Sequence, residues 1–178
     1  MQHTPALSSP AHGRPGFVGF TVPRDAFNVA SPEALQVDAQ GRFDRSAGAF
    51  TRGWQKAYSR FKKALASPQI KGAVLLVGLP GSGKSTWLEK NYDSAIAYFD
   101  AVLATPGARA PLIRMSQAAG KPITIVHLDT PVAVAKQRNS KRPPERRVPD
   151  ASIEKSVLAL ATCAPSTSEG AARVIRVR

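Results

Sequence analysis

The stretch Gly78-Leu79-Pro80-Gly81-Ser82-Gly83-Lys84-Ser85-Thr86 decides the fold of this chain. It follows a short apolar run, residues 73–77, that predicts a buried strand, and residues 84–90 after it predict a helix. The glycines let the backbone wrap so that several N–H groups point at one anion, and the start of a helix adds a positive dipole end. A strand, a glycine-rich turn and a helix in this order, with the pattern G-x-x-x-x-G-K-[ST], predict a phosphate-binding loop.

The side chains of the loop suit a nucleotide with its magnesium ion. Lys84 is long enough to reach β- and γ-phosphates, and the Ser85 hydroxyl is a ligand for Mg²⁺. The alternative is a glycine-rich turn without a ligand, which the agreement of strand, pattern and helix disfavours. The residues expected to bind Mg-ATP are Gly78, Pro80, Gly81, Ser82, Gly83, Lys84, Ser85 and Thr86.

Strands and helices alternate at short spacing on the C-terminal side of this loop. Thr105-Pro106 predicts a helix start, although Pro111 makes that boundary less certain, and Gly120 ends the helix. Thr130-Pro131 and Asp150 are expected to cap two further helices, which end at Pro143-Pro144 and near Thr162. Further strands are expected at 95–99, 123–128 and 174–177. The alternation predicts an α/β fold of the P-loop NTPase type, with a parallel sheet flanked by helices.

The region before the loop divides at about residue 50. Residues 1–49 are rich in proline and predict an extended arm that packs on the core, with one possible strand at Phe17–Val22. Residues 50–66 predict an amphipathic helix with an aromatic face and a cationic face, and residues 50–178 form the main domain. The cationic face is either a solvated surface or a contact for nucleic-acid phosphates. The aromatic face comprises Phe50, Trp54, Ala57, Tyr58, Phe61, Ala64 and Leu65, and the cationic face Arg52, Lys56, Arg60 and Lys63.

Composition restricts the remaining classes of protein. Of 178 residues, 25 are Lys or Arg and 12 are Asp or Glu, which gives a net charge of +13 and favours a polyanionic partner. Cys163 is the single cysteine, so a disulfide framework is excluded. Neither a secretory signal at the N-terminus nor an apolar run long enough to span a membrane is found. The chain is therefore expected to be cytoplasmic, without a membrane partner.

A second basic cluster begins on the helix expected after Thr130-Pro131 and continues into the loop at Pro143-Pro144. Six cationic residues lie between Lys136 and Arg147, and Arg138 and Arg142 share a helix face if that helix continues. Residues 138–149 thus predict either a mobile lid, whose arginines close over a phosphoryl group, or a solvated basic loop.

Residues 72–170 resemble the P-loop polynucleotide 5′-hydroxyl kinase family and its relatives, the zeta-toxin-like ATPases. The resemblance rests on the loop, Arg138-Asn139-Ser140-Lys141-Arg142, Val148-Pro149, Asp100-Ala101 with Arg109, and more weakly Glu169-Gly170. It implies that Lys84 and Ser85 bind phosphate and Mg²⁺, and that Arg138 and Arg142 stabilise the transferring phosphoryl group. Asp100 would be a catalytic and metal-binding carboxylate, with Asp93 and Asp129 as weaker candidates that also fit turn or cap roles.

One departure from that family concerns the phosphoryl acceptor. The family has two strands between the loop helix and the strand at 123–128, and the earlier one supplies an aspartate that takes the proton of the acceptor hydroxyl. Only one strand fits here. Either the acceptor-activating segment is missing, or Asp100 performs both functions.

The sequence therefore predicts a kinase that transfers the γ-phosphoryl of Mg-ATP to a hydroxyl, on a nucleic-acid 5′ end or a nucleotide. The alternatives are a nucleotide-binding module or slow ATPase without an acceptor site, and a small-molecule or toxin-type kinase.

Overall fold

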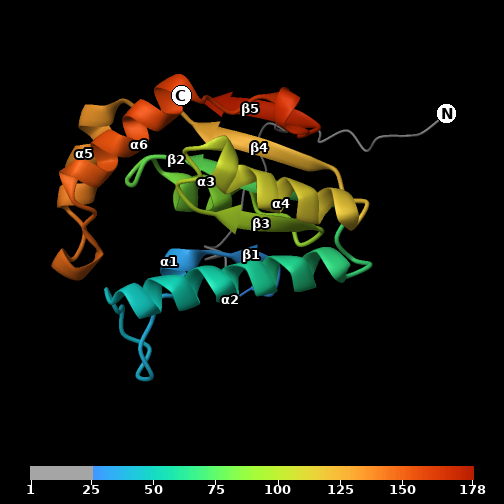
Figure 1. Cartoon of the computed structure of the whole chain (residues 1–178), viewed down its shortest axis with the longest axis horizontal. Helices are drawn as coiled ribbons and strands as arrows, with labels where there is room; N and C mark the ends of the chain where they lie inside the picture. Colours follow the sequence, from blue (N-terminus) through green and yellow to red (C-terminus); the bar gives the residue numbers. More distant parts are fainter. Residues whose placement is uncertain (1–25) are drawn as a thin grey trace, which may run out of the picture.

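The computed structural model describes residues 26–178, so the possible strand at Phe17–Val22 lies outside the described residues. Strands and helices alternate along the chain (Figure 1). In order they are β1 (Val29–Ala30), α1 (Pro32–Leu35), α2 (Ala47–Ala66), β2 (Gly72–Gly78), α3 (Lys84–Asn91), β3 (Ile96–Asp100), α4 (Pro106–Ala118), β4 (Ile123–Leu128), α5 (Val132–Ser140), the 3-10 helix η1 (Pro144–Arg146), α6 (Asp150–Thr162), the 3-10 helix η2 (Thr167–Glu169) and β5 (Arg173–Val177).

The strands form one parallel sheet in the order β1-β3-β2-β4-β5. In this register Leu76 pairs with Asp100, and Gly78 at the end of β2 pairs with Leu128. The carboxyl ends of all strands therefore meet at one edge, where ligands bind in parallel α/β sheets. The expected α/β fold with a parallel sheet is confirmed.

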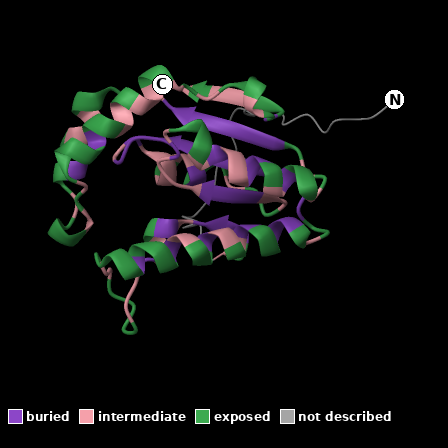
Figure 2. Ribbon diagram, viewed as in Figure 1, coloured by how far each residue is buried: buried purple, intermediate pink, exposed green. Residues whose placement is uncertain are grey.

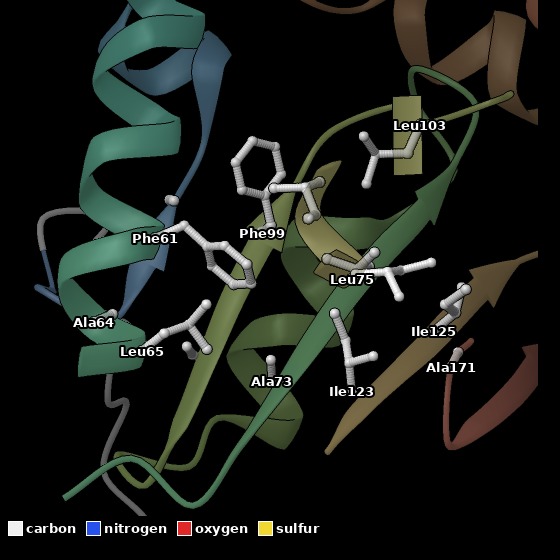
Figure 3. Packing of buried hydrophobic residues seen from close by; sticks show 14 of the residues in the cluster. Phe61, Ala64, Leu65, Ala73, Leu75, Phe99, Leu103, Ile123, Ile125 and Ala171 are labelled. Carbon is white, nitrogen blue, oxygen red and sulfur yellow. The ribbon is translucent and has the colours of Figure 1, made fainter. Parts of the chain in front are cut away.

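The core fills both faces of the sheet, because alternate residues of β2 point to opposite sides. Ala73, Leu75 and Val77 pack with α2 and α4, whereas Val74 and Leu76 pack with the face covered by α3. Figure 3 shows the α2 side, where Phe61 and Leu65 of α2 lie against Leu75 and Phe99 of the sheet. Figure 2 shows buried strands at the centre, while α5 and α6 are largely exposed.

The helix ends agree with the sequence at some caps and differ at others. Thr105 caps α4 by accepting from the Ala108 N–H at 3.3 Å, and Pro111 lies inside that helix without ending it. Thr130 and Asp150 do not act as caps, because Pro131 and Pro149 occupy those positions. The Thr130 hydroxyl instead donates to the Ser82 carbonyl at 2.8 Å, which joins the end of β4 to the loop.

The residues just before α2 are part of the fold. Residues 26–46, which fall in the expected arm, contain β1 at the sheet edge beside β3, and α1, which packs on α2. The Ser46 side chain accepts from the Ala49 N–H at 3.1 Å, so α2 begins at Ala47, before the expected start at Phe50. Within residues 26–178 no helix is both long and apolar enough to cross a membrane.

Candidate active site

The loop between β2 and α3 lies at the carboxyl edge of the sheet. Gly83 precedes α3 with φ of 93°, a left-handed conformation that favours glycine. Gly81 has φ of 82° and lies against α5, where an added Cβ would collide with the Ala135 carbonyl. A side chain at Gly81 would therefore separate the loop from α5, so the close packing of the two requires glycine.

Lys84 lies at the start of α3 with its ammonium turned back into the loop. The Nζ atom donates to the carbonyls of Gly78 and Leu79 at 2.9 and 3.0 Å. Burial lowers the pKa of Lys84, while the charges of Asp100 and Glu33 act in the opposite direction. An anion held in this loop would compensate the positive charge of this half-buried side chain.

Ser85 and Asp100 meet across the gap between α3 and β3. The Ser85 hydroxyl donates to Asp100 Oδ2 at 3.3 Å, and both side chains line the cleft described below. Hydroxyl and carboxylate oxygens are ligands that Mg²⁺ prefers. Within residues 26–178 no group of three His, Cys, Asp or Glu side chains is placed to hold a metal ion. A cation at this pair would thus take its remaining ligands from phosphate and water.

The other loop residues divide between the surface and the interior. Pro80, Gly81, Gly83 and Thr86 line the cleft, and of these Pro80 is itself buried. Gly78 and Ser82 are buried, and Ser82 Oγ has no hydrogen-bond partner among the described residues. A buried hydroxyl without a partner is unfavourable, which suits a loop that binds a polar ligand.

The basic segment begins in the last turn of α5, which lies beside the loop, and continues past the end of that helix. Arg138 is exposed, with Nη1 3.5 Å from the Gly81 carbonyl, and Arg142 forms an ion pair with Glu33 at 3.4 Å. The Asn139 side chain closes this segment by two hydrogen bonds to the backbone of Val148, at 2.8 and 3.0 Å. We call residues 138–149 the lid. Its two arginines and the loop share one cleft.

Two residues that precede α2, Phe43 and Arg45, contact the lid. The Arg45 guanidinium donates to the carbonyls of Pro144, Glu145 and Arg147 at 2.8, 2.6 and 2.7 Å. The guanidinium of Arg146 lies over the ring of Phe43, 5.3 Å from its centroid. Sequence analysis did not find Arg45 or Phe43, because about a hundred residues separate them from the lid.

Together these parts enclose a cleft of about 860 Å³. One wall is the loop with Ser85 and Asp100, the second is the lid, and the third comes from residues 31–54. The third wall brings Glu33, which the sequence analysis did not single out, and the aromatic residues Phe43, Phe50 and Trp54. The volume lies within the range of small-molecule sites.

The faces of α2 are less uniform than the sequence predicts. Ala57, Phe61, Ala64 and Leu65 are buried, whereas Phe50 is 55% exposed and lies at the cleft with Trp54. Of the cationic residues, Arg52 lies 3.8 Å from Asp44, and Arg60 is half-buried with Nη1 3.5 Å from the Val29 carbonyl. Within residues 26–178, Lys56 and Lys63 are the members of that set that are exposed and form no ion pair or side-chain hydrogen bond.

The weaker carboxylate candidates lie in structural contacts. Asp93 Oδ1 accepts from the Ala95 N–H at 2.8 Å within a turn, and Asp129 pairs with Arg176 of β5 at 2.8 Å. Arg109 is fully buried, and its guanidinium binds both carboxylate oxygens of Glu169 at 2.7 and 2.8 Å. Arg109 and Glu169, two of the residues on which the family resemblance rests, thus form a buried ion pair and do not line the cleft.

No protein-family model matches this chain, and no curated protein matches it. The functional assignment therefore depends on the geometry of the cleft and on the motifs that line it.

Proposed function

We propose that this protein is a P-loop phosphotransferase that binds Mg-ATP and transfers its γ-phosphoryl group to a hydroxyl. The observation that carries the proposal is the 3.3 Å contact between Ser85 and Asp100. It joins the residue after Lys84 to a carboxylate at the end of the neighbouring strand. That pair, beside a glycine-rich loop at a helix start, has the composition of a Mg-nucleotide site.

The residues of the cleft have separate roles in this proposal. The loop N–H groups and Lys84 bind the phosphates, and Ser85 and Asp100 hold the cation. A Mg²⁺ ion held by Ser85 and Asp100 would supply positive charge that offsets part of the phosphate charge. Arg138 and Arg142 line the same cleft as the loop and would stabilise the negative charge on the migrating group.

The outer part of the cleft favours an acceptor on a nucleic-acid 5′ end or a nucleotide. Phe50 and Trp54 present aromatic surface beside arginines of the lid. Aromatic faces stack on bases and arginines bind phosphates, which is the combination used for single-stranded nucleic acid. A nucleotide-binding module that lacks an acceptor site has no comparable use for this wall.

Calorimetry with ATP, in the presence and absence of Mg²⁺, tests the binding step. The wild-type protein should bind ATP more tightly with Mg²⁺, and Asp100→Asn should remove most of that difference. Asp93→Asn is the matched control, because Asp93 lies in a turn outside the cleft. Absence of ATP binding would refute the proposal. Binding without transfer to a 5′-hydroxyl oligonucleotide, a nucleoside or a small alcohol would favour the binding-module alternative.

A further inference from the structure

Of the three carboxylates that line the cleft, Asp100 and Glu33 also line a small pocket beside it, whereas Glu145 of the lid does not. A small pocket of about 60 Å³ lies beside Ser85 and is lined by Asp100 on the β3 side and by Glu33 on the α1 side. Asp100 accepts a hydrogen bond from Ser85, so it lies on the cation side of the pocket. Glu33 also lines the larger cleft, together with the aromatic residues Phe43, Phe50 and Trp54.

The sheet order explains why Glu33 is there. β1 is parallel to β3 and lies at the sheet edge, so its carboxyl end faces the same side as the loop. Ser31 follows β1 directly and its side chain accepts from the Ala34 N–H at 3.4 Å, which starts α1 with Pro32 as its first residue. Glu33 thus comes three residues after a strand end, on an element fixed by a cap and a proline.

The charges around Glu33 are those of a reaction site. Arg142 of the lid forms an ion pair with Glu33 at 3.4 Å, and the negative charge of Glu33 acts to raise the pKa of Lys84. The ion pair joins partly exposed groups and contributes little to stability. A weak contact of this kind can be exchanged when a phosphate enters the cleft and attracts Arg142.

We propose that Glu33 is the general base that activates the acceptor hydroxyl, supplied by the segment before the loop. The inference rests on the proposed phosphotransferase function. It also divides the work between two carboxylates, with Asp100 on the cation and Glu33 on the acceptor. The acceptor-activating element is then not missing but precedes the loop in the chain.

The proposed step balances without a further reactant. The acceptor oxygen forms a bond to the γ-phosphorus while its proton passes to the Glu33 carboxylate. The bond from the γ-phosphorus to the bridging oxygen breaks, and ADP leaves with that electron pair. Glu33 then loses its proton to water. A general base contributes about 10²- to 10⁴-fold to such a step.

Transfer from Mg-ATP to a 5′-hydroxyl oligonucleotide and to water tests this assignment, because water serves as an acceptor when no better one is bound. Glu33→Gln should lower kcat at least about 100-fold, while the KM for ATP stays within about threefold. Glu33→Asp keeps the carboxylate and should retain part of the rate. Unchanged melting temperatures would show that the loss is chemical.

Two other carboxylates lie near the site: Glu89 lines the small pocket from α3 but not the larger cleft, and Glu145 lines the larger cleft but not the small pocket. Glu89→Gln should leave kcat within about twofold of the wild type, since general-base catalysis requires contact with the acceptor. A normal rate in Glu33→Gln, or a loss confined to Glu89→Gln, would overturn the assignment of Glu33. Wild-type protein that binds Mg-ATP but transfers phosphate to neither acceptor would overturn it too, and would leave the ATP site standing. Failure to bind ATP would instead refute the proposed function.

Discussion

At the scale of single residues, Lys84 is a charge whose environment suits an anion. Its ammonium is held by two carbonyls of the loop, and burial lowers its pKa. Withdrawing this charge from water costs free energy of folding, so removal of the ammonium is not expected to unfold the protein. This environment supports the proposed role of Lys84 in binding phosphate.

Lys84→Ala should abolish Mg-ATP binding and leave the protein folded. In the proposed function the ammonium is the charged group of the loop that binds the phosphates, and charge-assisted contacts to phosphate are strong. Calorimetry gives the affinity and circular dichroism the fold. Lys90→Ala is the matched control, since Lys90 is exposed at the other end of α3. Unchanged affinity in a folded Lys84→Ala protein would remove the phosphate-binding assignment of the loop.

Arg142→Ala should reduce turnover far more than ATP affinity, and Arg138→Ala should do so to a smaller degree. Arginines that act on charge developing in the transition state contribute about 10³-fold or more. Arg142 is the half-buried member of the pair, facing Glu33, whereas Arg138 is exposed. Initial rates at saturating ATP separate kcat from KM, with Lys141→Ala, an exposed lid residue, as control. Wild-type rates in both variants would show that residues 138–149 are a solvated basic loop without a catalytic role.

At the scale of elements, the lid is positioned by a segment remote from it in sequence. Three carbonyls around η1 are bound by Arg45, and Asn139 closes the lid on itself. Backbone carbonyls bound by a guanidinium are held by charge-assisted hydrogen bonds. The position of the lid arginines thus depends on residues that precede α2.

Arg45→Ala should release the lid. Loss of one hydrogen bond to a charged group costs about 1.5–3 kcal/mol, so trypsin cleavage within residues 138–149 should become about tenfold faster or more. The cleavage sites are identified by mass spectrometry. Arg42→Ala is the control, because Arg42 pairs with Asp38 and not with the lid. Equal cleavage rates in both variants would show that Arg45 does not hold the lid.

The elements also show what sequence reasoning can and cannot find. The strands at 73–77, 95–99 and 123–128 were predictable, since a buried parallel strand is a short apolar run between turn residues. The positions of Lys84 and Ser85 at the start of α3 were predictable as well, because both residues belong to one contiguous sequence motif. The two-residue strand β1 has no period to detect, and the contacts of Glu33 and Arg45 with the lid span about a hundred residues. Such contacts follow from the order of strands in the sheet, which local patterns do not specify.

At the scale of the whole molecule, one buried ion pair joins the two ends of the C-terminal half. Arg109 of α4 is fully buried, and it binds Glu169 of η2 together with the carbonyls of Leu103 and Cys163. Glu169 in turn accepts from the Ser166 N–H within a capping box. The pair therefore connects the segment after β3, the end of α6 and the approach to β5.

Glu169→Gln should destabilise the whole domain, because it leaves the buried guanidinium of Arg109 without its counter-charge. Breaking a buried ion pair by removal of one partner costs about 3–5 kcal/mol, which is a large part of the stability of an ordinary domain. Glu154→Gln is the control, since its pair with Lys136 is exposed and worth at most about 1 kcal/mol. Urea unfolding followed by circular dichroism measures both. Because Arg109 and Glu169 lie away from the cleft, ATP affinity measured well below the unfolding midpoint should remain at the wild-type value. Equal midpoints for the two variants would mean that other contacts of Arg109 satisfy its charge. A loss of ATP affinity in folded Glu169→Gln protein would mean instead that the Arg109–Glu169 ion pair helps to position Asp100 at the end of β3.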